Sequence, residues 1–383
     1  MLLAISNSGL WRGLWYSLIG LSAIALYAGA LRTAGIEWAR IRWSLIGVYV
    51  VAYVWWFFAN GIIIDRVSVL WSFAIFLTVA SVGRPWREWV RSAGDLSLFV
   101  AMWLAYDESR GIADGLGMPI QVESVRDLDR FLFFGADPVV ELQAAFHRTE
   151  VAERIVNGEA VLRTVTDVQW YDVVGSFVYY SHFIVPPIVI GALWLINRHQ
   201  WVRYMRRFAT LLFGACVMFI LLPTAPPWMA AGGTNRVGLD LEALPPLSRH
   251  TGVGWRYVGL GSFVQAWDTG RDWANQVAAM PSLHSAFALF VVVFFWPWVR
   301  NPWARVAMLA YPLAMAVALA YFAEHYIVDA IAGWLLVGAS FWLWNRIEVW
   351  LATRSVPIDD VMLGDDEADK TRDSLVSADA TTA

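Results

Sequence analysis

The chain has 383 residues, of which 58% are hydrophobic and only 16% are charged, with a formal net charge of −4. Soluble domains typically carry about 25% charged residues, so this composition excludes a large soluble enzyme and indicates a membrane protein. The chain has no basic patch with interleaved aromatic residues, so no nucleic-acid partner is expected, and its single cysteine, Cys216, excludes an internal disulfide framework.

Apolar runs long enough to cross a bilayer recur along the chain. A helical span needs about 17–25 residues. The runs lie approximately at 14–32, 43–63, 67–83, 93–107, 171–196, 206–223, 282–299, 304–323 and 327–350. We therefore predict an all-α fold, a polytopic transmembrane bundle of about nine helices. The fourth run is the least certain of them, because it is short and contains Asp95.

The distribution of arginine predicts how these spans are oriented. Arginines such as Arg84, Arg203 and Arg300 crowd the short connections on one face, whereas two long polar intervals lie on the other. Short loops rich in arginine stay in the cytoplasm. We therefore expect a multi-pass protein of the cell membrane, with both long intervals outside and the carboxyl-terminal tail inside.

These features divide the chain into three parts. Residues 1–90 are predicted to form amino-terminal transmembrane helices, 91–350 the membrane domain with the candidate site, and 351–383 a disordered acidic tail. Within the middle part, amphipathic stretches in 108–170 predict short helices along the outer membrane surface. The Gly-, Pro- and Trp-rich interval 224–281 predicts an ordered cap.

Two histidines and an aspartate are brought together by this topology. His284 follows Pro281 at the start of the seventh predicted span, and His325 ends the eighth, so both lie at the outer face. Asp329 follows His325 by four residues, and on a continuous helix both side chains would share one face. An acid next to an apolar run is costly unless it has a partner or a role.

These residue types fit attack on a phosphate ester. Asp329 can accept a proton from one ring nitrogen of His325 and leave the other nitrogen to attack phosphorus. A protonated His284 can donate to the leaving oxygen. A metal site built from the same residues and Glu324 is the less favoured alternative, because a clear third ligand is missing.

Two short motifs resemble those of a known family. The sequence Met-Pro-Ser-Leu-His-Ser at 280–285 resembles the Pro-Ser-x-His motif of the type 2 phosphatidic acid phosphatase superfamily. The sequence Glu-His-Tyr-Ile-Val-Asp at 324–329, followed by Gly-Trp, resembles its His-x-x-x-Asp motif. Leu283, the His-Tyr pair and the Pro-Pro-Trp loop at 226–228 are closer to the inositol phosphorylceramide synthase-like branch of inositolphosphotransferases and its bacterial relatives.

The resemblance covers about 170–350 and implies a six-helix catalytic core. It implies His325 as nucleophile, Asp329 as its orienting partner and His284 as general acid, with a phosphohistidine intermediate and no metal or other cofactor. The superfamily's phosphate-binding arginine is absent, since the matching region reads Ala318-Leu319, and its lysine motif is also missing. Both departures favour transfer over hydrolysis.

Other groups must therefore hold the phosphate. Arg110 ends the fourth predicted span, and His182 lies three turns into the fifth, where an ionisable residue is a functional candidate as well as a possible core residue. The residues expected to bind substrate are Arg110, Ser282, Asn275, Gln276 and His182.

The predicted activity is the movement of a phosphorylated headgroup to or from a lipid, so a lipid phosphate in the membrane is the expected partner. Inositol phosphate is suggested by the family resemblance alone. The alternative is a lipid or polyprenyl phosphate phosphatase with water as acceptor, which would use the same three residues. A transporter would be indicated by repeats with broken helices, which the sequence does not display, and a non-catalytic scaffold is equally disfavoured.

Overall fold

The computed structural model describes residues 38–60, 66–112, 118–156, 159–233, 243–261, 264 and 276–353. The predicted span at 14–32 and the tail from 354 onward lie outside the described residues. The chain divides into two compact units, Met1–Ala105 with Trp255–Ala274 and Tyr106–Gly254 with Asn275–Ala383.

The first unit is built on apolar helices. α2 (Trp38–Asn60) and α3 (Arg66–Ala80) pack against each other, and the Tyr49 hydroxyl donates to the Ser72 carbonyl over 2.9 Å. α4 (Trp86–Ile112) begins in this unit and ends in the second. These three helices coincide with the second, third and fourth apolar runs of the sequence.

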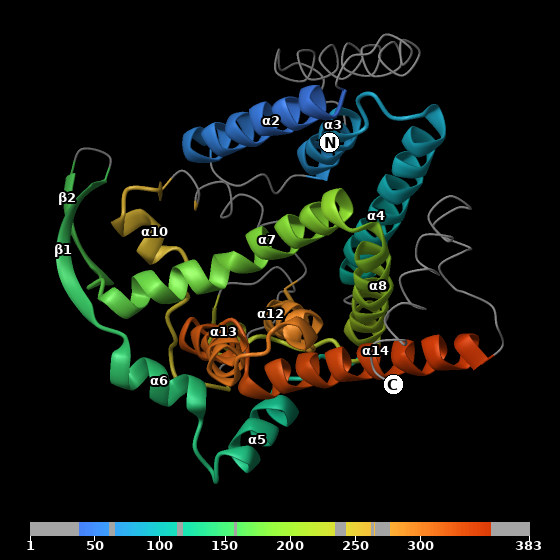
Figure 1. The fold of residues 1–383 in the computed structure, drawn as a ribbon. Helices are drawn as coiled ribbons and strands as arrows, with labels where there is room; N and C mark the ends of the chain where they lie inside the picture. Colours follow the sequence, from blue (N-terminus) through green and yellow to red (C-terminus); the bar gives the residue numbers. More distant parts are fainter. Residues whose placement is uncertain are drawn as a thin grey trace. The chain divides into compact units, whose positions relative to one another are not determined.

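The second unit holds the remaining long helices. They are α7 (Trp170–Ile196), α8 (Arg198–Leu221), α12 (Leu283–Phe295), α13 (Pro302–Tyr321) and α14 (Ile327–Thr353), as Figure 1 shows. A short 3₁₀ turn, η2 (Trp296–Trp298), follows α12. Each of the five helices coincides with one of the last five apolar runs.

Four helices within the described ranges are long and apolar enough to cross a membrane, namely α7, α8, α13 and α14. Two shorter apolar helices, Ser68–Ala80 and Leu283–Trp298, accompany them. The protein is therefore a helical membrane protein, while nine spans and a six-helix catalytic core stay predictions.

α12 lies among the other helices of this unit and contacts α7, α8, α13 and α14. Its residues are apolar on every side, as expected of a helix surrounded by protein. Phe290 is fully buried, and the ring of Tyr204 from α8 meets it edge-on at 4.9 Å. This position makes the first turn of α12 the place where several helices converge.

The interval 108–170 contains more than helices. α5 (Glu123–Leu132) and α6 (Pro138–Phe146) are short helices, as expected, but β1 (Thr149–Val156) and β2 (Glu159–Thr166) form an antiparallel hairpin. Val156 pairs with Glu159, so the connection is two residues, Asn-Gly. That dipeptide favours the tight turn of a hairpin, which the sequence analysis did not predict.

The described residues of the interval 224–281 have little regular secondary structure. It contains α9 (Pro227–Ala230) and α10 (Val253–Tyr257), and Thr224 makes isolated parallel bridges to Gln121 and Ala278. Trp228 and Leu244 share a buried cluster with residues from α5, α6 and the start of α14. The parts of the interval around Trp228 and Leu244 therefore pack with the two short helices against the α13–α14 turn.

Arginines are buried at the other end of α14. The guanidinium of Arg207, which is 2% exposed, donates to both carboxylate oxygens of Glu348 over 2.9 and 2.8 Å and to the Asn345 side chain over 2.8 Å. Ser340 donates to the carbonyl of Arg207 over 2.7 Å. α8 and α14 are thus joined by a buried charged network, which costs little only because its members are paired.

Candidate active site

The site is organised by the turn between α13 and α14. α13 ends at Tyr321, and Ala323 adopts a left-handed backbone with φ of 56°. The Glu324 amide donates to the Leu319 carbonyl over 2.9 Å, and the Ala323 amide to Ala320 over 3.0 Å, the two hydrogen bonds of a Schellman motif. Glycine usually fills the left-handed position, so alanine stores some strain at this turn.

His325 and Asp329 meet across the start of α14. His325 Nδ1 lies 3.3 Å from Asp329 Oδ2, and the same oxygen accepts the Tyr326 amide over 3.0 Å. The predicted proximity is therefore present, but it does not come from a continuous helix, because His325 precedes α14, which begins at Ile327. An acid in the first turn reaches back to the helix start, as in a capping box.

This contact orients the imidazole. Asp329 is fully buried and His325 is 7% exposed. With its hydrogen on Nδ1, His325 donates to the carboxylate and presents the lone pair of Nε2 on the other side of the ring. The pair therefore has the arrangement of a nucleophile held by an acid.

His284 reaches the same place from the first turn of α12. The Ser282 amide donates to the Asp329 carbonyl over 2.9 Å, so the two motifs are joined through the backbone. Gly333 lets α14 approach closely, since a Cβ there would lie 2.6 Å from the Ser282 carbonyl oxygen. The His284 and His325 rings lie 5.4 Å apart, centroid to centroid. Two histidines 41 positions apart thus face one site.

Rings from α7 and α12 alternate around His284. Tyr179 stacks on His284 at 5.0 Å, His182 lies 4.1 Å from His284, and Phe287 stacks on His182 at 5.1 Å. The predicted residue His182 is therefore in contact with a candidate catalytic ring. The His284 ring is thus held between Tyr179 and His182.

An ion pair that the sequence analysis missed lies beside His325. Arg249 donates from Nε and one terminal nitrogen to the two oxygens of Glu324, over 2.6 and 2.9 Å. Its guanidinium also lies 4.3 Å from the Trp228 ring centre. A bidentate pair is the strongest arrangement of this kind, and it engages the carboxylate considered above as a metal ligand. Among the described residues, no group of three or more His, Cys, Asp or Glu side chains is arranged to hold a metal.

Comparison with protein families gives one match. A family model described as the PAP2 superfamily matches residues 144–343, which include both histidine motifs. The chain belongs to the PAP2 superfamily. Membership implies phosphatase or phosphotransferase activity on lipid phosphates. No curated protein and no solved structure matched the chain in the other comparisons.

The structure describes only some of the remaining residues predicted to bind substrate in this PAP2 protein. Ser282 is fully buried, and its hydroxyl accepts the Ser285 amide over 3.4 Å as a helix cap. Gln276 is half-buried ahead of α12. Asn275 and the side chain of Arg110 lie outside what the structure describes. Substrate binding by these residues stays a prediction.

A buried carboxylate from α5 holds the start of α14. Asp129 accepts the amide of Ile327 over 3.0 Å and that of Val328 over 2.7 Å. It is 1% exposed, and burial raises its pKa to about 6, although the two amides favour the charged form. These amides are among the unpaired donors of a helix start, so Asp129 acts as a cap from almost 200 residues away.

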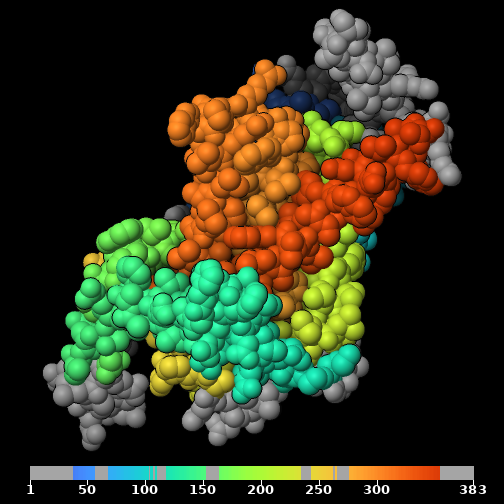
Figure 2. Space-filling view, turned by 90° about the horizontal axis from the view of Figure 1, so that it is seen from below, coloured from blue at the N-terminus to red at the C-terminus, as the bar shows by residue number. Residues whose placement is uncertain are grey.

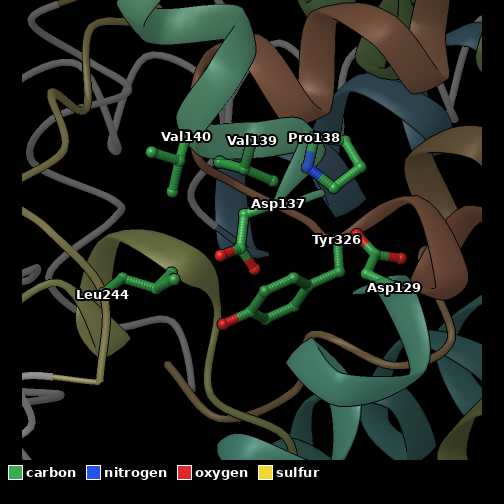
Figure 3. A pocket seen from close by; sticks show the side chains of 7 residues that line it. All are labelled: Asp129, Asp137, Pro138, Val139, Val140, Leu244 and Tyr326. Carbon is green, nitrogen blue, oxygen red and sulfur yellow. The ribbon is translucent and has the colours of Figure 1, made fainter. Parts of the chain in front are cut away.

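Further contacts fix the same layer. The Gln143 side chain donates to the carbonyls of Ser248 and Tyr321 over 2.7 Å each, which ties α6 to the loop that carries Arg249. Next to the turn, Tyr326 lines a narrow crevice with Asp129, Leu244 and residues 137–140, shown in Figure 3. The crevice is too tight to hold a water molecule, so it is a packing defect and no ligand site.

Proposed function

We propose that the protein is an integral membrane phosphotransferase that moves a phosphorylated headgroup to or from a lipid through a phosphohistidine on His325. The observation that carries the proposal is the 3.3 Å contact between His325 Nδ1 and the buried carboxylate of Asp329, with the His284 ring 5.4 Å away. Membership of the PAP2 superfamily supports a lipid phosphate as the substrate.

The proposed reaction has two steps. Nε2 of His325 attacks phosphorus, the bond to the leaving oxygen breaks, and protonated His284 gives its proton to that oxygen. In the second step neutral His284 takes a proton from the acceptor hydroxyl, whose oxygen attacks the phosphohistidine and releases His325. Asp329 stabilises the positive charge on His325 while the phosphorus is attached.

The acceptor decides between the two candidate activities. A lipid or glycan hydroxyl gives transfer, and water gives hydrolysis of a lipid or polyprenyl phosphate. The absence of the motif arginine and lysine from the sequence supports transfer, and inositol phosphate is the headgroup that the family resemblance suggests. We propose that Arg110, Ser282, Asn275, Gln276 and His182 contact the substrate.

Substitution tests the mechanism. We expect His325→Ala to abolish turnover in proteoliposomes and His284→Ala to lower it by about 10²–10⁴-fold, with Asp329→Asn also severely impaired. Excess EDTA should leave activity intact and vanadate should inhibit it. Full activity of either histidine variant would overturn the proposal, and loss in EDTA that one divalent ion restores would favour the metal site. Product analysis with and without a lipid alcohol distinguishes transfer from hydrolysis.

We further propose that the active site faces the outside of the cell membrane and that the tail is cytoplasmic. The support is the arginine-rich character of the short connections in the sequence. A cysteine at Ser262 should react with an impermeant thiol reagent in whole cells, and one at Ser374 only after lysis. The reversed pattern would place the site in the cytoplasm.

A further inference from the structure

One exposed side of α5 is apolar. Leu128, Phe131 and Leu132 fall at helical spacing on one side of this helix, and all three are exposed, Phe131 to 79%. The side that packs against the protein carries Val125 and the carboxylate of Asp129. A helix on a water-soluble surface usually exposes polar side chains and buries apolar ones, so this exposed apolar side and the buried carboxylate are unusual.

The apolar surface continues into the turn before α6. Phe134 is 100% exposed and adopts a left-handed backbone with φ of 56°, which bulky residues rarely do. The Gly135 amide donates to the Arg130 carbonyl over 2.7 Å and closes the turn. Contiguous exposed aromatic residues in a strained, ordered turn mark a contact surface. We call Leu128 and residues 131–134 the apolar tip.

The apolar tip is held at the end of a membrane-spanning helix. Asp129 accepts the first amides of α14, so α5 lies at the height where that span begins. Arg126 forms a bidentate pair with Asp137 over 3.0 and 2.9 Å, which fixes α5 to the start of α6. Figure 2 shows α5 and α6 in teal against the orange and red of α13 and α14. The end of a span is where headgroups meet acyl chains.

We propose that the apolar tip inserts into the lipid boundary at the end of α14, as a second membrane contact besides the spanning helices. The exposed charged side chains of α5, Glu123, Asp127 and Arg130, lie on the side of the helix away from Leu132 and can face the aqueous side of the boundary. Helices that lie in an interface divide their apolar and charged residues in this way. The insertion would fix the depth of the α13–α14 turn, and it does not depend on the proposed chemistry.

Spin labels measure this depth directly. In the full chain carrying Cys216→Ala, single cysteines replace Phe134 or Asp127 and are labelled with a nitroxide. The proteins are purified into phosphatidylcholine liposomes and compared by power saturation with oxygen and with a water-soluble nickel chelate. We expect the label at 134 to collide more often with oxygen than with nickel, and the matched label at 127 to show the reverse.

A second variant separates insertion from misfolding. In a protein labelled through Phe131→Cys, adding Phe134→Ser should lower the oxygen-to-nickel ratio at 131, whereas Phe146→Ser at the far end of α6 should leave it unchanged. Unaltered helix content and a single size-exclusion peak are required of each variant. A water-like label at 134 in pure liposomes overturns the proposal. If that label is protected only in native membranes, the tip binds a protein there, which equally overturns insertion into lipid.

Discussion

Asp129 is a buried carboxylate whose ionisation should be visible in the stability of the protein. Burial raises its pKa from 3.8 to about 6, so the folded state holds a proton between these values that the unfolded state has lost. At about 1.36 kcal/mol for each pKa unit, ionised Asp129 costs about 3 kcal/mol of folding free energy. Its contribution is most favourable below pH 4, declines as the pH rises, and reaches its minimum above pH 6.

Two substitutions separate the free-energy cost of burying the charge of Asp129 from the contribution of its hydrogen bonds. Asp129→Asn removes the charge and keeps one acceptor for the amides of Ile327 and Val328, so we expect its stability at pH 8 to stay within about 1 kcal/mol of wild type. Asp129→Ala leaves both buried amides without their acceptor, at about 1–3 kcal/mol each. Neither variant should show the titration near pH 6.

The assay is thermal unfolding in detergent at pH 5, 6, 7 and 8, with the difference between wild type and Asp129→Asn as the measured quantity. Taking the difference cancels the titration of histidines and other groups that both proteins share. Wild type should gain several degrees relative to the Asn variant between pH 8 and pH 5. Parallel curves for the two proteins would refute the assignment of the raised pKa to Asp129.

Two further predictions concern the site itself. Gly333→Ala should destabilise the protein by about 1–3 kcal/mol and lower its activity in proteoliposomes, because the added Cβ would lie 2.6 Å from the Ser282 carbonyl oxygen. The control is Gly338→Ala on the same helix, which meets open space and should be neutral. Arg249→Gln should cost about 3 kcal/mol in thermal unfolding by leaving Glu324 unpaired, and adding Glu324→Gln should restore most of it. An active Gly333→Ala protein, or a double variant as unstable as the single one, would contradict these expectations.

The long helices were predictable from the sequence because each overlaps an apolar run, although α4 begins well before its run and α12 ends before its run does. The β1–β2 hairpin was missed because the whole interval 108–170 was predicted to form short helices. Its strands are rich in valine and threonine and are joined by Asn157-Gly158, a turn signal that was available in the sequence. The exposed faces of α5 could not be predicted, because hydropathy does not tell protein contacts from lipid contacts.

The sequence predicted which residues come together at the candidate site, but not the contacts that they make there. The spacing of His325 and Asp329 and the topology of α12–α14 bring the three residues together, but the contact is made by a helix cap and not along a helix face. The Arg249–Glu324 pair joins residues 75 positions apart through a loop, and no local pattern specifies it. A nearly buried carboxylate is costly unless it is paired, but the sequence did not indicate which residue would pair with Glu324.

α14 is fastened at both ends, by the Asp129 carboxylate at its first turn and by the Arg207–Glu348 pair at its last turns. Sliding this helix along its axis would break both sets of buried hydrogen bonds together, so a piston-like stroke of α14 is strongly opposed. Of the helices around the candidate site, α7 is the one expected to bend more easily than α14. Pro186 and Pro187 remove two amide donors from its middle, one to two turns beyond the rings that surround His284, and a helix bends most easily at such a place.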